Sequence, residues 1–506
     1  MWDESRYRHK NIGMEGNMDI IKIHALDNVV VALSDIKKGE VSDSIVALED
    51  VNRGHKIAIK DISKGEDIVK YGLVIGVATK DIKMGQWVHV HNVKTKLSEE
   101  ESYSYNYVKS TLKPRTAKTF MGYERLDGRV GIRNEIWIIP TVGCVNGIVQ
   151  SLVNKNQHLV KDNIDGLYSF PHPFGCSQMG DDQENTKRLL AALVNHPNAG
   201  AVLVVGLGCE NVTMPLFKAE LGNYDENRVK FMSAQDSEDE IEDGAKLLEE
   251  LAEYARQFRR KEVSSNRLLI GMKCGGSDGL SGITANSAVG KFSDYLISEG
   301  GSTILTEVPE MFGAEKMLMN RCQNEEVYNK AVDMISGFKD YFVSHNQVVY
   351  ENPSPGNKAG GITTLEDKSC GCVQKSGSAQ IMDVIGYGQQ VQTRGLNMLN
   401  GPGNDLVSAT ALTAAGCHMV LFTTGRGTPF GAPAPTVKIS SNTALYEKHR
   451  KWIDFNAGTI AEHKESIDET GERLLNYVLE VASGKLTNTE RSGYREISIF
   501  KDGVVL

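Results

Sequence analysis

Four cysteines stand in loops rich in glycine or polar residues, where a thiol is free to meet a ligand. They are Cys144, Cys176, Cys209 and Cys274. Thiolates bind soft metal ions and iron–sulfur clusters, so three or four converging loops of this kind would make a metal site. No second cysteine stands three residues from any of the four, so only the fold could assemble a cluster. The alternative, that each thiol is a small apolar filler of the core, stays open at this point.

Two histidines offer a different metal site. His24 and His55 both lie among short β-favouring runs near the N-terminus. Imidazoles suit iron(II) or manganese(II) in a site of mixed nitrogen and oxygen ligands. His89 and His91 would share one face of a strand, because side chains alternate along it, and are better explained as ordinary surface or core residues. The same ordinary explanation stays open for His24 and His55.

Residues 351–361 form a rigid polar stretch that suits a polyol. Two prolines and three glycines surround the side chains of Asn352, Ser354, Asn357 and Lys358. Amides and hydroxyls both donate and accept hydrogen bonds, as the hydroxyls of a sugar require. The alternative is an ordinary rigid connector.

A second glycine-rich loop carries Arg426 and Thr428. An arginine fork among backbone amides suits a carboxylate, although a structural ion pair is equally compatible with the sequence. The glycines of this loop are spaced wrongly for a dinucleotide fingerprint, and the chain contains no Walker A lysine loop. A nucleotide-dependent enzyme is therefore disfavoured.

Most of these loops follow apolar runs of strand length, at 136–142, 201–205, 268–271 and 418–424. Apolar residues recur at helical spacing in the segments 238–260, 325–345 and 469–482. Strands that alternate with helices predict an α/β fold with a parallel sheet, whose ligands bind at the carboxyl ends of the strands. Cysteines repeatedly placed at such ends are the main pointer to an active site.

The N-terminal part has a different texture. Short β-favouring runs alternate with a turn phrase that begins with Asp and ends with Gly, at 35–39, 61–65 and 81–85. This pattern predicts a small β domain. We divide the chain into an N-terminal extension (1–18), a β domain (19–92), a linker (93–119) and an α/β catalytic region (120–506), whose two subdomains are expected to meet near residue 350.

Charge and composition narrow the class of partner. The chain has 506 residues and a net charge of −9, which disfavours nucleic acid. Its longest apolar run, 201–205, falls far short of the roughly 20 residues that span a membrane. Residues 1–17 do not resemble an export signal, so eight cysteines indicate reduced thiols in the cytoplasm. A small anionic molecule is the expected partner, and assembly as a homo-oligomer is compatible with the sequence.

Several long and unusual phrases resemble the altronate/galactarate dehydratase family, and its altronate branch most closely. Examples are Gly131-Ile-Arg-Asn134, Phe174-Gly-Cys176-Ser-Gln178 and Thr424-Gly-Arg-Gly-Thr-Pro429. The others lie at 21–28, 53–56, 140–147, 206–211, 274–286 and 352–361, and the altronate branch is indicated by 180–182, 305–315 and 416–419. Ser287 and Cys370 depart from the family pattern.

The resemblance implies an SAF-type β-clip domain followed by a large catalytic region. It implies an Fe²⁺- or Mn²⁺-dependent hydro-lyase that converts D-altronate into 2-dehydro-3-deoxy-D-gluconate and water in hexuronate catabolism. Galactarate dehydration, or a sulfo-lyase reaction on sulfolactate, is the alternative on the same scaffold, and a binding module without catalysis is a third possibility that the full-length catalytic region disfavours.

Within this reaction each candidate residue receives an expected role. We expect His24 and His55 to bind the metal, with His55 also catalytic, and the four cysteines to be the alternative ligand set. Lys358 is the expected base and Arg426 the clamp on the substrate carboxylate. The expected hydroxyl contacts are Asn352, Ser354, Asn357 and Thr428. A colourless protein with a single metal ion is favoured over an iron–sulfur protein.

Overall fold

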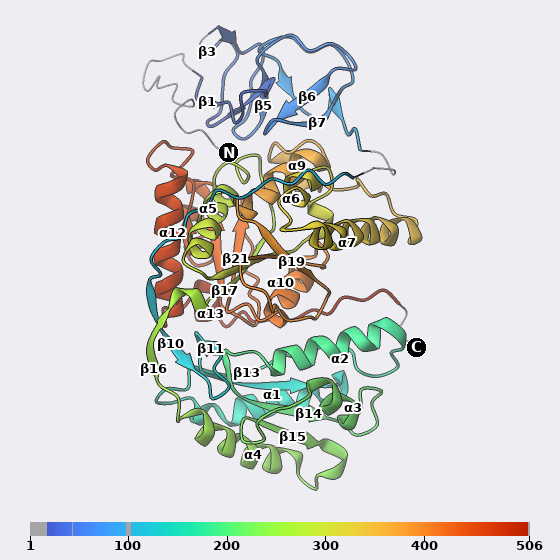
Figure 1. The fold of residues 1–506 in the computed structure, drawn as a ribbon, viewed down its shortest axis with the longest axis vertical. Coiled ribbons are helices and arrows are strands. Elements are labelled where there is room, and N and C mark those ends of the chain that lie inside the picture. The colour runs from blue at the N-terminus through green and yellow to red at the C-terminus, as the bar shows by residue number, and fades with distance from the viewer. Residues whose placement is uncertain (1–17, 43, 98–102, 504–506) are drawn as a thin grey trace.

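The computed structural model describes residues 18–42, 44–97 and 103–503. Three parts follow one another along the molecule: the β domain, a part built on a seven-stranded sheet, and a part built on a four-stranded sheet (Figure 1). Most of the expected N-terminal extension, residues 1–17, lies outside the described residues. Among the described helices, none combines the length and the apolar character needed to cross a membrane.

The β domain consists of short antiparallel strands. Its four-stranded sheet contains β1 (Ile20–Ile21), β2 (Val29–Ala32), β5 (Lys56–Ala58) and β8 (Trp87–Val88). Two smaller sheets contain β6 (Asp67–Lys70), β7 (Leu73–Ala78) and β9 (Val93–Lys94), and β3 (Val41–Ser42) with β4 (Ile45–Val46). The repeated turn phrase is confirmed as a device for tight turns: its glycines Gly39, Gly65 and Gly85 have φ of 92°, 86° and 86°, which side chains disfavour.

The four-stranded sheet is parallel, with the order β13-β12-β14-β15. Its strands are β12 (Glu135–Pro140), β13 (Gly166–Ser169), β14 (Ala199–Gly206) and β15 (Val229–Ser233). Every residue of β12 and β14 is buried, because helices cover both faces. One face packs on α1 (Asn146–Lys155) and α4 (Glu240–Ala255), and the other on α2 (Gly180–Val194) and α3 (Met214–Leu221).

The seven-stranded sheet is also parallel, with the order β19-β20-β18-β17-β21-β22-β23. Its strands are β17 (Leu269–Cys274), β18 (Ser302–Leu305), β19 (Ile381–Ile385), β20 (Leu396–Leu399), β21 (Met419–Thr424), β22 (Thr436–Ser440) and β23 (Phe455–Asn456). The larger core cluster includes α5 (Ala285–Ser298), α7 (Glu325–Ser344), α9 (Leu365–Cys372) and α12 (Ile467–Ala482), while α10 (Asp405–Ala414) belongs to the core of the opposite face. The three predicted helices are confirmed as α4, α7 and α12.

The expected subdomain boundary near residue 350 is corrected by the sheet topology. Strand β18 lies before residue 350 and β20 after it, yet the two strands pair directly in one sheet. The change between the two parallel sheets instead occurs at β16 (Arg260–Ser264), which pairs with β10 (Thr119–Glu124) in a small antiparallel sheet with β11 (Val130–Gly131). The predicted linker (93–119) begins with β9 of the β domain, and its residues 103–118 contain no helix or strand. These residues lie against the seven-stranded part: the Tyr105 hydroxyl donates to the carbonyl of Cys322 at 2.6 Å.

Candidate active site

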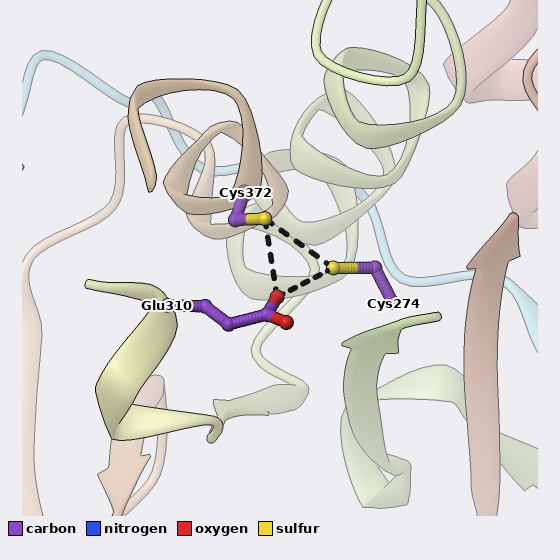
Figure 2. A group of neighbouring side chains, drawn as sticks. All are labelled: Cys274, Glu310 and Cys372. Carbon is purple, nitrogen blue, oxygen red and sulfur yellow. Dashed lines mark hydrogen bonds between the residues drawn. The ribbon is translucent and has the colours of Figure 1, made fainter. Parts of the chain in front are cut away.

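Two thiols and one carboxylate meet at the carboxyl edge of the seven-stranded sheet (Figure 2). Cys274 is the last residue of β17, Glu310 ends the short helix η6 (Val308–Glu310) that follows β18, and Cys372 ends α9. The Cys274 and Cys372 sulfurs are 3.4 Å apart and lie 3.0 and 3.2 Å from Glu310 Oε2. Among the described residues this is the single group of at least three His, Cys, Asp or Glu side chains whose ligand atoms all lie within 4.8 Å of one another.

Charged side chains surround this group and pair with one another, and all of them except the half-buried Asp405 are buried. Lys368 Nζ is 2.7 Å from Glu310 Oε1, and Lys375 Nζ is 3.3 Å from Glu307 Oε2. Lys273 Nζ bridges Glu307 at 3.0 Å and Asp405 at 2.7 Å. Buried charges are costly unless they are paired, so the lysines and carboxylates must be kept together by the surrounding fold.

The electrostatic environment separates the two glutamates. Burial opposes ionisation of Glu310, but the nearby Lys368 and Lys375 ammonium groups outweigh it and hold the pKa of Glu310 below its usual range. Burial raises the pKa of Glu307, and Lys273 opposes this effect only in part. The hydrogen bond with Cys274, together with burial, raises the pKa of the Cys372 thiol well above its usual range. Without a bound metal ion, Cys372 is therefore a thiol at neutral pH.

Glu307 is held in a strained backbone conformation. Its φ of 70° and ψ of 57° lie in the left-handed region, which is unfavourable for a residue with a side chain. The strain places the Glu307 carboxylate where it accepts the backbone N–H of Cys274 at 2.9 Å. Strain of this kind persists at functional sites because the surrounding contacts over-determine it.

The donor set fits one divalent metal ion. Three ammonium groups (Lys273, Lys368, Lys375) already balance three carboxylates (Glu307, Glu310, Asp405). Ionising both thiols would add two negative charges, which one divalent cation neutralises, and a bound metal deprotonates the thiols that coordinate it. Two thiolates with one carboxylate suit iron(II) better than manganese(II), which prefers oxygen and nitrogen ligands.

The β domain closes this edge of the sheet. Lys56 and Lys70 from β5 and β6 both pair with the buried carboxylate of Asp367 on α9, at 2.7 and 3.0 Å. Burial lowers the pKa of Lys56 to about 8, although Asp367 opposes the shift. The backbones also touch: a Cβ on Gly279 would meet the Gly54 carbonyl oxygen at 1.9 Å, and one on Gly361 would meet it at 2.4 Å. Three glycines thus allow the two parts to pack backbone to backbone.

A cavity of about 300 Å³ opens beside this contact. Its walls include three cationic side chains, Arg53 of the β domain with Arg426 and Lys448, and the carboxylate of Asp278. Asp278 also lines a second, very narrow cavity of about 10 Å³ that reaches Lys368 and Cys372. Asp278 therefore stands between an open cationic pocket and the buried group around Glu310. Such a pocket suits a small anion whose reacting atoms are directed inward.

Comparison with known proteins identifies this architecture. Three family models match consecutive parts of the chain: "Altronate/galactarate dehydratase SAF domain" at residues 18–96, "D-galactarate dehydratase/Altronate hydrolase, second domain" at 122–256, and "D-galactarate/Altronate dehydratase, C-terminal" at 265–505. The chain belongs to the galactarate/altronate dehydratase family.

Individual relatives are similar over nearly their whole length. The chain is 52% identical to an altronate dehydratase of Bacillus subtilis (strain 168), over 96% of this chain and 99% of that one. It is 51% identical to an altronate dehydratase of Escherichia coli (strain K12), over 97% and 100%. Identity to a galactarate dehydratase (L-threo-forming) of Escherichia coli (strain K12) is 34%, over 92% and 93%.

In this family member the two predicted metal histidines do not form a metal-binding group. His24 is exposed, and its Nδ1 accepts the backbone N–H of Leu26 at 3.2 Å. His55 is buried with both ring nitrogens occupied: Nδ1 accepts from Trp87 Nε1 at 3.1 Å, and Nε2 faces the Ala359 carbonyl at 3.3 Å. Burial lowers the pKa of His55, which keeps the ring neutral. His55 therefore fixes the contact between the β domain and the 351–361 stretch rather than offering a free lone pair.

The polar 351–361 stretch is mostly occupied with its own structure. Ser354 and Asn357 form a capping box at the start of α8 (Pro355–Ala359), and Asn357 Nδ2 also donates to the Ser277 carbonyl at 2.8 Å. These two predicted substrate contacts are thus corrected to helix-capping residues. Asn352 does reach the site, since its Oδ1 accepts from Lys368 Nζ at 3.1 Å. Lys358, the predicted base, is half-buried at the end of α8 and is not among the residues that line either cavity.

The loop after β21 brings Arg426, the predicted carboxylate clamp, to the larger cavity. Arg426 is exposed and lines the larger cavity, with Nη1 3.3 Å from the Gly356 carbonyl as its nearest hydrogen-bond acceptor. Thr428 does not line either cavity; its Oγ1 accepts the backbone N–H of Phe430 at 3.4 Å, and its carbonyl accepts from buried Lys438 at 3.1 Å. The sequence therefore located one of the cationic side chains of the pocket.

The fold separates the four predicted cysteines. Cys274 lies in the buried group with Cys372, while Cys144, Cys176 and Cys209 are exposed at the other parallel sheet. Glu307, Glu310, Lys368 and Lys375 were not predicted as site residues, although Glu307 and Glu310 stand in the 305–315 phrase that indicated the altronate branch. Cys370, two residues before Cys372 in α9, is also buried but is not part of the group.

Proposed function

We propose that this protein dehydrates D-altronate to 2-dehydro-3-deoxy-D-gluconate and water. The observation that carries the proposal is the near full-length identity of 52% and 51% to two altronate dehydratases, against 34% to a galactarate dehydratase. The cationic pocket supports it, because an aldonate brings one carboxylate and several hydroxyls into a space of about 300 Å³. We further propose that the enzyme works on hexuronate-derived acids in the cytoplasm, which agrees with its eight unpaired cysteines.

The proposed cofactor is Fe²⁺ or Mn²⁺ at Cys274, Glu310 and Cys372, in place of the histidine site expected from the sequence. When bound, the ion would act as a Lewis acid that stabilises negative charge on the substrate. The thiols favour Fe²⁺ of the two. The three lysines around the group supply further positive charge that needs no reorganisation during the reaction.

The chain's own residues would bind the acid and move its protons. Arg53 and Arg426 would hold the carboxylate, and Asp278, which lines both cavities, would accept the C2 proton in preference to Lys358. Lys368 would donate to the departing C3 hydroxyl, because Glu310 outweighs burial and raises its pKa, so it is protonated at neutral pH. Loss of the C2 proton and the C3 hydroxyl leaves an enol, which tautomerises to the keto acid.

A second candidate substrate, galactarate, follows from the same pocket. A second carboxylate needs a second cation, and the pocket contains a third cationic side chain, Lys448, beside the two arginines. The positive charge of the pocket is therefore sufficient for a diacid as well. Our preference for D-altronate depends on the sequence identities.

The test is a substrate panel with enzyme stripped of metal under anaerobic conditions and reloaded with Fe²⁺, Mn²⁺ or Mg²⁺. D-Altronate, galactarate and sulfolactate are compared in a keto-acid assay. We expect Fe²⁺ to restore turnover, with kcat/KM for D-altronate about 100-fold above that for galactarate, equivalent to about 2.7 kcal/mol. Full activity in stripped enzyme would contradict the metal, and equal kcat/KM values would contradict the substrate.

A further inference from the structure

Three exposed thiols gather at the carboxyl edge of the four-stranded sheet, away from the pocket described above. Cys144 follows β12 in the short helix η2 (Gly143–Val145), Cys176 follows β13, and Cys209 follows β14. The three strands are direct neighbours in the sheet and parallel, so their carboxyl ends lie side by side. Free cysteines are usually buried, and these three are exposed.

Hydrogen bonds lock the three cysteine loops to one another. The backbone N–H of Gly143 donates to the Phe174 carbonyl at 2.8 Å, which joins the first loop to the second. The backbone N–H of Ser177 donates to Asn211 Oδ1 at 2.7 Å, which joins the second loop to the third. The loops are therefore held as one surface rather than as three independent segments.

The edge is prepared for a negatively charged group. Each cysteine precedes the start of a helix, α1, α2 or α3, and none of these helices has a side-chain cap on its N-terminal amides. The N-termini of α2 and α3 thus leave backbone N–H groups and partial positive charge at this edge, of which Asp181 and Asp182 in the first turn of α2 offset a part. Helix α1 continues from η2, and the N–H of Asn146 is bonded to the Gly143 carbonyl. A metal cluster carried by three thiolates is anionic and suits such an environment.

Two side-chain amides in the same loops offer further donors. Gln178, in the Cys176 loop, is 3% exposed, and its Nε2 has no hydrogen-bond partner. Its Oε1 is already used, because it accepts the backbone N–H of Gly175 at 3.0 Å. A buried amide N–H group without an acceptor is costly, so an acceptor belongs in this loop. Gln235 Nε2 already donates to the Cys209 sulfur at 3.5 Å.

The spacing of the three sulfurs argues against a single metal ion. Thiolates on one tetrahedral ion, with metal–sulfur bonds of about 2.3 Å, lie roughly 4 Å apart. The three sulfurs do not all lie within 4.8 Å of one another, unlike the group at Cys274. A four-iron cluster is larger than one ion, and its thiolates stand farther apart.

We infer that Cys144, Cys176 and Cys209 bind a [4Fe–4S] cluster at this edge. Each thiol gives up its proton as its sulfur binds one iron, so three irons carry protein ligands and the fourth is open to a small oxygen ligand. A bound cluster would make the protein coloured, contrary to the colourless protein expected from the sequence. It also differs from the four-cysteine alternative, since Cys274 belongs to the other sheet. The inference is independent of the proposed dehydration.

The test is anaerobic reconstitution of the full chain with iron, inorganic sulfide and a thiol reductant. We compare wild type, the triple variant Cys144→Ser/Cys176→Ser/Cys209→Ser, and the matched double variant Cys274→Ser/Cys372→Ser. Wild type should take up about four sulfide per chain, with four iron in the cluster besides the one Fe²⁺ proposed at Cys274, Glu310 and Cys372, and absorb broadly at about 400 nm. The double variant should keep this absorption and the triple variant should lose it, with far-UV circular dichroism unchanged because the exchanged thiols are exposed.

Several results would overturn the inference. They are uptake of more than one iron per chain without sulfide, a chromophore that survives in the triple variant, and a chromophore lost in the double variant but kept in the triple one. The readout is cluster content rather than turnover. An enzyme that fails to dehydrate D-altronate but binds the cluster would therefore refute the proposed function alone, and the converse would refute this inference alone.

Discussion

The two parallel sheets place cysteines at the same topological position and surround them differently. At the seven-stranded sheet, Cys274 is 1% exposed, covered by the β domain and enclosed by paired lysines and carboxylates. At the four-stranded sheet, Cys144 and its neighbours are exposed and face uncapped helix N-termini. The strand ends determine where a ligand is bound, but burial and charge determine which ligand. Tightly grouped buried donors suit one small ion, and widely spaced exposed donors suit a larger cluster.

The largest expected effect comes from breaking the buried group. Glu310→Gln removes the carboxylate that contacts both thiols and leaves the lysines around it without their full counter-charge. Cys372→Ala removes one thiol without changing that charge. We expect each variant to lower kcat/KM for D-altronate at least about 1,000-fold, or about 4 kcal/mol. Steady-state rates and anaerobic iron content measure the effect.

Cys370→Ala is the control for this prediction. Cys370 lies in the same helix and is equally buried, but it is not part of the group. It should lose stability through the small cavity it leaves, while keeping its bound metal and most of its activity. A Cys372→Ala enzyme with wild-type activity would mean that the chemistry takes place elsewhere.

The second prediction concerns the ion pairs that hold the β domain in place. Asp367→Asn leaves Lys56 and Lys70 buried without a carboxylate, so we expect it to lower the free energy of unfolding by about 3–5 kcal/mol. Asp50→Asn is the matched control, because its pair with Lys37 is 3.0 Å long but exposed to water, and it should cost much less. Denaturant unfolding of both variants provides the comparison. Equal losses would show that burial of the pair does not matter.

Much of the fold could be predicted because its signals are local. Helices α4, α7 and α12 follow the spacing of their apolar residues, and the Asp-to-Gly turn phrase gives the tight turns of the β domain. The subdomain boundary could not be predicted in the same way. Pairing of β18 with β20 across residue 350 depends on contacts between distant parts of the chain, which a local pattern does not encode.

The site was predictable only in part, for the same reason. Arg426 was found because an arginine in a glycine-rich loop has a chemical meaning within its own segment. Glu310 and Lys368 become site residues only when their separate segments are brought to 2.7 Å. Ser354 and Asn357 mislead for the opposite reason: the residue types that bind hydroxyls also cap helices, and here they cap α8.

The third prediction tests the four-stranded sheet through its response to acid. Burial lowers the pKa of His172 to about 4, and its Nε2 bonds the Pro140 carbonyl at 2.8 Å beneath the cysteine loops. In the unfolded chain the His172 ring takes up its proton near pH 6.5, but in the folded chain it does so only near pH 4. The free energy of unfolding therefore decreases as the pH falls from 6.5 to about 4. The loss for this one group is about 2 kcal/mol at pH 5.

Replacing His172 isolates its share of this loss. His172→Gln should reduce the change in unfolding free energy between pH 7.5 and pH 5 by about 2 kcal/mol relative to wild type. His158→Gln alters an exposed ring near the same sheet and should leave the change as it is. If His172→Gln has the wild-type pH dependence, the ring is already protonated in the folded protein at pH 5.

The smallest effect sharpens the comparison at the open pocket. Arg53 is the one residue that carries positive charge from the β domain into the larger cavity, and it lies on the rim, where water weakens its pull on an anion. Arg53→Ala should therefore raise KM for D-altronate about 10-fold, or about 1.4 kcal/mol, with little change in kcat.

Two variants serve as controls for this prediction. Arg53→Lys should recover part of the loss, and Lys38→Ala, on an exposed turn of the same domain, should have no effect. Cluster content at the four-stranded sheet should be equal in all three variants, because the β domain covers only the seven-stranded edge (Figure 1). A fall in kcat at constant KM would instead mean that Arg53 acts on the transition state, and that the β domain takes part in the chemistry as well as in binding.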